Sequence, residues 1–96
     1  MIDDNEFENI KEIVKSFFKE AGFNVDVEGG FMERDGEDVL DVNIKTGEAQ
    51  TLIGKQGLVL ADIQLLLRKV IKKKTDKDFY LSLDIDGYKK NKEDYL

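Results

Sequence analysis

The sequence predicts an α+β fold in which a three-stranded sheet is covered on one face by helices, in the order α-β-β-α-α-β. Two long segments repeat their apolar residues every three to four positions, which is the spacing of an amphipathic helix. Three shorter segments alternate apolar and polar residues, which is the spacing of a strand with one buried face. Strands that are apolar on one face need one covering layer of helices.

The first element is a helix predicted for residues 4–21. Its apolar stripe consists of Phe7, Ile10, Val14, Phe17 and Ala21, widened by Ile13 and Phe18. Asp3, Asp4 or Asn5 is suited to cap its first turn, and Gly22 is placed to end it. We expect this stripe to pack on the sheet.

A hairpin is predicted after this helix. The first strand runs from Phe23 to Phe31, and Gly29-Gly30 is expected to form a bulge within it. Asp35-Gly36 predicts a tight turn, and the second strand is expected over Val39–Lys45. The residues expected on the buried faces are Phe23, Val25, Val27, Phe31, Leu40, Val42 and Ile44.

The rest of the fold is predicted to be two helices, separated by a glycine pair, and a last strand. Glu48–Ile53 is long enough for one or two helical turns, and Gly54–Gly57 interrupts it. The second long helix runs from Leu58 to about Lys74, and the last strand from Phe79 to Ile85. The buried stripe expected on this helix is Leu60, Ile63, Leu67, Val70 and Ile71, with Leu66 beside it.

The composition is that of one folded domain. The apolar fraction is 41% over 96 residues, which is enough for a single small core. We expect residues 1–88 to form this domain and residues 89–96 to be a tail or the start of a linker helix. No apolar run is long enough to cross a membrane, and the start MIDDNEFENI is unlike a signal peptide. With no cysteine for disulfides, we expect a cytoplasmic protein without a membrane partner.

The composition argues against an enzyme. The chain has no His and no Cys, so a Ser–His or Cys–His catalytic arrangement is excluded. Its two serines, Ser16 and Ser82, fall inside a predicted helix and a predicted strand, and no residue pattern positions an Asp/Glu pair. Asp84-Ile85-Asp86-Gly87 superficially resembles the start of a calcium loop but lacks the later acidic ligands. We expect no catalytic residue, no cofactor, no metal and no small-molecule substrate.

The net charge of −6 is unevenly distributed along the chain. Residues 1–48 hold five basic and fourteen acidic side chains, a net charge of −9, whereas residues 49–96 hold ten and seven, a net charge of +3. A binder of nucleic acid needs a local basic surface for phosphates rather than a basic total. The basic excess begins at Lys55, inside the stretch LIGKQG.

The glycine pair in LIGKQG has two interpretations. It is either an ordinary turn between two helices, in which glycine relieves positive φ angles, or a clamp for a nucleic-acid strand. In the second case Gly54 and Gly57 admit the sugar–phosphate backbone, Lys55 supplies a cation and Gln56 a hydrogen-bonding group. The following helix adds main-chain N–H groups at its positive end. KH domains clamp about four nucleotides with such a GxxG loop, while the spacing of a P-loop is absent.

The basic run on the second long helix also has two interpretations. It comprises Arg68, Lys69, Lys72, Lys73, Lys74 and Lys77. Cations near a helix C-terminus are favourable against the macrodipole whatever the function. Lys69 and Lys73 share a helix face, so a phosphate-contacting role for them is the second interpretation.

Two segments, GEAQTLIGKQGLVLADIQLLLRKVI and FYLSLDIDGYKKNKEDYL, resemble the KH domain of bacterial Jag proteins, also called SpoIIIJ-associated proteins. The shared features are Gly47-Glu48-Ala49, Leu52-Ile53-Gly54, Gly57, Leu60…Ile63-Gln64…Leu67 and Leu83–Tyr88. The resemblance implies a type II KH fold in a cytoplasmic RNA-binding protein linked to cell elongation, the envelope or sporulation. It also implies a second nucleic-acid-binding domain after the KH domain. Gln56 stands where the family often has a second basic residue.

The expected function is therefore non-catalytic binding of single-stranded RNA through the GKQG loop. Leu52, Ile53 and Leu58 are expected to form apolar walls beside the bases, with Ile44 contributing from the neighbouring strand. One such domain binds weakly, so a second KH protein or a second copy of the chain is a candidate partner. The alternative is a protein-interaction module that keeps the fold but binds a basic protein, motivated by the acidic first half.

Overall fold

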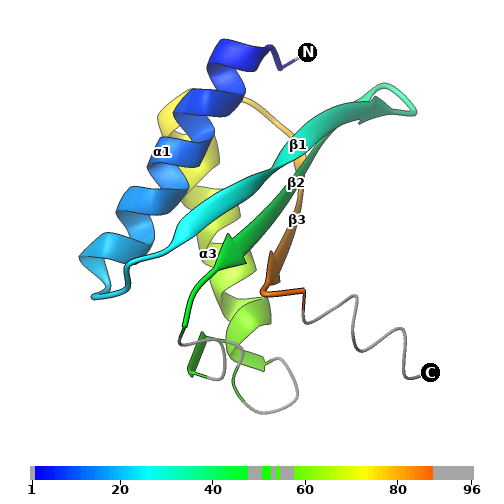
Figure 1. Cartoon of the computed structure of the whole chain (residues 1–96). Coiled ribbons are helices and arrows are strands. Elements are labelled where there is room, and N and C mark those ends of the chain that lie inside the picture. Colours follow the sequence, from blue (N-terminus) through cyan, green and yellow to red (C-terminus); the bar gives the residue numbers. More distant parts are fainter. Residues whose placement is uncertain (1, 48–50, 53, 55–57, 88–96) are drawn as a thin grey trace, which may run out of the picture.

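The computed structural model describes residues 2–47, 51, 52, 54 and 58–87. Within them the elements are α1 (Asp4–Glu20), β1 (Asp26–Arg34), β2 (Glu37–Lys45), α3 (Leu58–Thr75) and β3 (Tyr80–Ile85). The predicted α+β class is confirmed: α1 and α3 lie on the same side of a three-stranded sheet (Figure 1). The short helix predicted over Glu48–Ile53 lies mostly outside the described residues. Within this range Thr51 and Leu52 are described, and both are helical.

Capping residues fix both ends of α1. The Asp3 carboxylate accepts a hydrogen bond of 2.8 Å from the Glu6 N–H, and the Glu6 carboxylate accepts one from the Asp3 N–H, which completes a capping box. At the other end, the Gly22 N–H donates to Lys19 O and the Phe23 N–H to Phe18 O. Gly22 has a φ of +94°, so this end is a Schellman motif. The predicted start and stop signals are confirmed.

The predicted hairpin is confirmed, with β1 antiparallel to β2 and Arg34 paired with Glu37. The two residues of the turn, Asp35 and Gly36, have φ angles of +53° and +80°, as a type I′ turn requires. The strand that was expected to begin at Phe23 begins instead at Asp26, because the residues after Gly22 complete the cap of α1.

The expected bulge at Gly29-Gly30 is wrong. Gly29 pairs with Val42 and Gly30 with Asp41, one residue against one, through the middle of the hairpin. The reason for glycine is a close approach: Gly29 has a φ of +143°, and a Cβ atom there would lie 1.9 Å from Asp41 O. Glycine at this position lets the backbone of the neighbouring strand come close, and no extra residue is inserted into the ladder.

The third strand joins the sheet in parallel, because α3 crosses over between β2 and β3. The strand order is β1-β2-β3, with Leu40 beside Leu81 and Ile44 beside Ile85. Buried side chains from one face of the sheet and from both helices form one core. They include Leu40, Val42, Ile44, Leu81, Leu83 and Ile85 of the strands and Ile10, Val14, Phe18, Leu60, Leu67 and Ile71 of the helices. The alternation read in the sequence is therefore confirmed on β2 and β3.

The stripe predicted on α3 is narrower than expected. Leu60, Leu67 and Ile71 are buried, whereas Ile63 and Val70 are only half-buried. Leu66, expected beside the stripe, exposes 53% of its surface because it lies on the flank of the helix away from the sheet. Among the described residues, neither helix has the length and apolar content that a membrane span requires.

Candidate nucleic-acid interface

Four element ends meet at one end of the molecule. They are the C-terminal ends of α1, β2 and β3 and the N-terminal end of α3 (Figure 1). Leu52 and Gly54, the two described residues of the stretch LIGKQG, belong to the connection from β2 to α3. Four residues of the predicted interface, Ile53, Lys55, Gln56 and Gly57, lie outside the described residues, and their arrangement remains a prediction.

Gly54 is described, and its position needs glycine. Its φ is +72°, and a Cβ atom there would lie 2.4 Å from Cγ2 of Val59 and 3.2 Å from the Val59 backbone nitrogen. The residue therefore lies against the first turn of α3 in a left-handed conformation that other side chains rarely adopt. Both a plain turn and a backbone clamp need a glycine here.

The predicted apolar walls divide into exposed and buried residues. Leu58 exposes 65% of its surface at the start of α3. Leu52 is buried, and Ile44 is completely buried on the core face of β2. Leu58 is thus placed to touch a ligand, while the side chains of Leu52 and Ile44 support this end from inside the core.

Val59 adds a second exposed apolar side chain that the sequence interpretation did not include. It is 40% exposed and lies directly against Gly54. Helical periodicity alone would have found it, because Val59 falls outside the buried stripe of Leu60, Leu67 and Ile71.

The charges along α3 favour an anion at its N-terminal end. Its first turn carries no acidic side chain, Asp62 follows at the fifth position of the helix, and three of its basic residues, Lys72, Lys73 and Lys74, lie in its last turn. The first N–H groups of a helix lack intrahelical partners, and the macrodipole adds partial positive charge there. An anion at this end would therefore be favoured over a cation.

Asp86 ties β3 to the chain that leads into the glycine segment. Its carboxylate accepts a hydrogen bond of 3.1 Å from the Thr46 N–H, and its own N–H donates to Ile44 O at 2.9 Å. Asp86 has a φ of +49°. Asp86 of the DIDG stretch thus holds the end of β2 in place.

Lys69 and Lys73 do not share this end of the molecule. Both are exposed on α3, but they follow Leu58 by 11 and 15 positions, or about 16 and 22 Å along the helix axis. Lys72 lies 2.8 Å from Asp78 across the end of the helix, and this contact lowers the pKa of that carboxyl. The structure therefore separates the predicted pair from Gly54 and Leu58.

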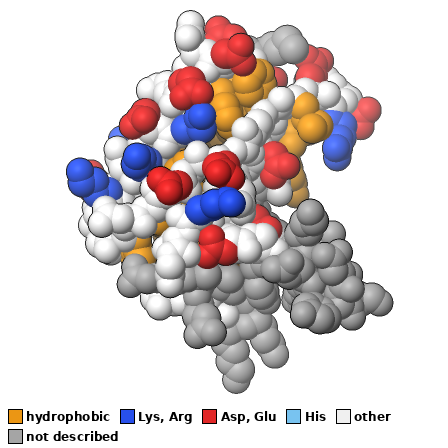
Figure 2. All heavy atoms as spheres, in the orientation of Figure 1, with side chains coloured by type: hydrophobic (Ala, Val, Ile, Leu, Met, Phe, Trp, Pro, Cys, Tyr) orange, Lys and Arg blue, Asp and Glu red, His pale blue; other side chains and the backbone are white. Residues whose placement is uncertain are grey.

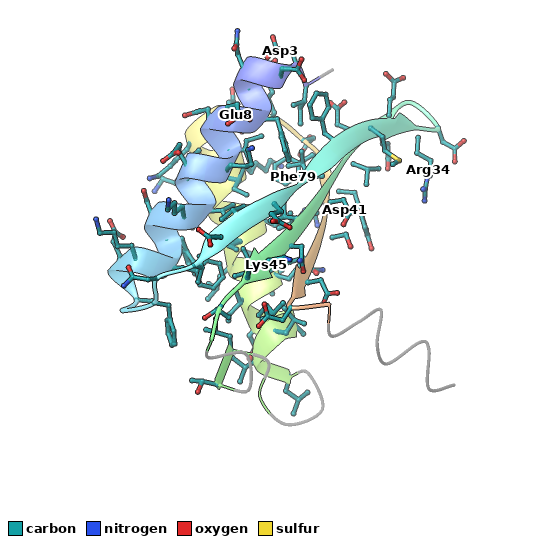
Figure 3. The ribbon with its side chains drawn as sticks, in the orientation of Figure 1. Asp3, Glu8, Arg34, Asp41, Lys45 and Phe79 are labelled. Carbon is teal, nitrogen blue, oxygen red and sulfur yellow. The ribbon has the colours of Figure 1, made fainter. Side chains whose placement is uncertain are left out.

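The face of the sheet away from the helices is polar and largely acidic. Asp41 and Lys45 project from β2 on this face (Figure 3), with Glu28 on β1 and Asp84 on β3 in the same layer. Lys45 Nζ lies 3.7 Å from Glu28 Oε2. Towards the hairpin, hydrophobic side chains gather on the surface (Figure 2), including Met32 and Tyr80, which expose 49% and 58%.

The described residues contain no group of three or more His, Cys, Asp or Glu side chains arranged to hold a metal ion. Comparison with known proteins adds no identification. The chain matches no protein-family model and no curated protein.

Proposed function

We propose that this chain is a non-catalytic domain of type II KH fold that binds single-stranded RNA through the GKQG segment. One observation carries the proposal: a left-handed glycine and two exposed apolar side chains meet at the N-terminus of α3, whose first turn carries no acidic side chain. Stacking or apolar contact for bases and donors for phosphates are the two needs of a single-strand binder. The order of the described elements, with a parallel β2–β3 crossover after the glycine segment, supports the fold assignment.

In this proposal the two parts of the ligand are bound by different groups. Gly54 and Gly57 let the sugar–phosphate backbone approach without Cβ atoms in the way, while Lys55 and Gln56 contact phosphates. The N–H groups at the start of α3 add donors at the positive end of the helix. Leu58 and Val59 lie beside the bases, so the interface reads nucleotides mainly by apolar contact and gives modest sequence preference.

A single domain of this kind binds weakly. One lysine in the clamp neutralises few phosphates, so the affinity falls only shallowly with salt. A second binding module on the same RNA would raise the overall affinity through effective concentration. A partner KH protein, a second copy of the chain or a following domain would each serve.

The test is to replace Lys55→Asp together with Gln56→Asp and to measure binding of a fluorescent single-stranded RNA by anisotropy. We expect binding to be lost, because the clamp then repels phosphates, while circular dichroism and melting temperature stay near those of the wild type. A matched control, Asn5→Asp with Lys74→Asp, makes the same change in net charge at the far end of α1 and α3. Unchanged RNA affinity in the folded clamp variant contradicts the proposal.

The second candidate function is a protein-interaction module for a basic partner. The observation that favours it is the helix-free face of the sheet, where Glu28, Asp41 and Asp84 share one layer. The same anisotropy measurement separates the two functions. If the wild type shows no binding to random single-stranded RNA at high micromolar protein and low salt, the interaction module becomes the better account.

A further inference from the structure

A basic hollow lies where α1 ends and the strands of the hairpin meet it. It has a volume of about 550 Å³. Lys15 and Lys19 line it from α1, Asn24 and Asp26 from the segment that leads into β1, and Lys45 and Thr46 from the segment that leaves β2. Three of these six side chains are lysines and one is an acid, although they come from the half of the chain with a net charge of −9.

Lys15 and Lys19 are available for a ligand. They are four residues apart, so they lie on the same face of α1 one turn from each other, and both are exposed. Four other lysines of the described chain are paired: Lys11 with Glu8, Lys45 with Glu28, Lys72 with Asp78 and Lys77 with Glu6. Within the described residues, neither Lys15 nor Lys19 takes part in an ion pair.

The position of the hollow connects it to the proposed clamp. Thr46 and Gly47 form part of its lining and begin the connection from β2 to the glycine segment. The end of α1, the end of β2 and the start of α3 lie at the same end of the molecule (Figure 1). The helix macrodipole explains why lysines suit the last turns of α1, but not why they line a hollow closed by β2.

We propose that this hollow binds a backbone phosphate of the RNA strand, beyond the nucleotides that the GKQG segment holds. The proposal rests on the proposed RNA-binding function and extends its surface onto α1. Lysine serves as a point charge for phosphate, and a compact anion between Lys15 and Lys19 replaces the carboxylate partners that they lack. Asn24, which also lines the hollow, contributes a neutral hydrogen-bonding group.

The test uses two charge-matched double variants and two lengths of RNA. Lys15→Gln with Lys19→Gln neutralises the hollow, and Lys72→Gln with Lys74→Gln removes the same charge at the far end of α3. Each protein is titrated into fluorescent oligouridylates of four and ten nucleotides. Four nucleotides are about what a GxxG clamp holds by itself, so only the longer strand has nucleotides left over for the hollow. The arginine pair, Lys15→Arg with Lys19→Arg, keeps the charge and is expected to bind as the wild type does.

The hollow variant is expected to bind the four-nucleotide RNA within twofold of the wild type. For the ten-nucleotide RNA we expect about a three- to tenfold loss and a salt dependence that is shallower by about 0.7 per lost phosphate contact. For the control variant, the change in affinity relative to the wild type is expected to be the same for both lengths of RNA. Melting temperatures establish that each variant is folded.

The outcomes separate the two proposals. If the wild type binds neither RNA, the proposed function fails and this extension fails with it. If the wild type binds ten nucleotides and the hollow variant binds them equally well, only the hollow is refuted. An equal loss in the control variant, or a polyglutamate peptide that competes better than unlabelled RNA, also overturns the assignment of this hollow to an RNA phosphate.

Discussion

At the scale of single residues, two glycines show that the need for glycine at a position depends on the atoms next to it. Gly29 and Gly54 both have positive φ angles, and at both a Cβ atom would collide with a neighbour. The neighbour of Gly29 is the backbone of Asp41, which cannot move without breaking the hairpin ladder. The neighbour of Gly54 is mainly the side chain of Val59. Gly29 is thus constrained by backbone and Gly54 mainly by a side chain at the start of α3.

We predict that Gly29→Ala destabilises the protein by about 2 kcal/mol or more, because a strained φ and a backbone clash combine. Gly30→Ala is the matched control, since nothing lies within 4 Å of a Cβ atom there. Its free energy of unfolding is expected to change by less than about 1 kcal/mol. Urea unfolding monitored by circular dichroism measures both. Equal stability of the two variants would show that Gly29 is not under the constraint described.

At the scale of elements, the start of α1 is joined to the segment between α3 and β3. Glu6 closes the capping box of α1 and also pairs with Lys77, which raises the pKa of that lysine through a hydrogen bond to the Glu6 carboxylate. Figure 3 shows Asp3 at this end of α1. One carboxylate therefore serves both the cap of α1 and the contact between α1 and the segment that joins α3 to β3.

The raised pKa of Lys77 predicts a dependence on high pH. A group whose pKa is higher in the folded state than in the unfolded state contributes its full stabilisation at pH values below the unfolded pKa, here 10.5. This stabilisation is lost as the pH rises through the folded pKa. Lys77→Gln should therefore lower the melting temperature at neutral pH, with a difference from the wild type that shrinks above the unfolded value. Melting curves at about pH 8 and about pH 11.5 test this. A difference that is the same at both values contradicts the pairing.

At the scale of the whole molecule, much of the fold follows from two periodicities. Alternation predicted the buried faces of β2 and β3, and the 3.6-residue period predicted α1 and α3, because each element has one face on a common core. The turn at Asp35-Gly36 and the cap at Gly22 were predictable for the same local reason, since positive φ angles demand particular residues.

Other features depend on contacts that no local pattern contains. The role of Gly29 is set by Asp41, which lies twelve residues later in the sequence and next to Val42, the ladder partner of Gly29. The hollow brings Lys15 and Lys19 next to Lys45 only because α1 packs beside the hairpin. Conversely, Lys69 and Lys73 share a helix face as predicted, yet the length of α3 carries them away from Gly54.

The central claim is that RNA binds at the end of the molecule formed by Gly54 and the start of α3. Nuclear magnetic resonance of the nitrogen-labelled chain, titrated with a four-nucleotide oligouridylate, tests it most directly. We expect amide shifts at Gly54, Leu58 and Val59, while the amides of Asp41 and Asp84 on the open sheet face stay unchanged. An absence of shifts at high ligand concentration, or shifts confined to the open sheet face, would contradict it.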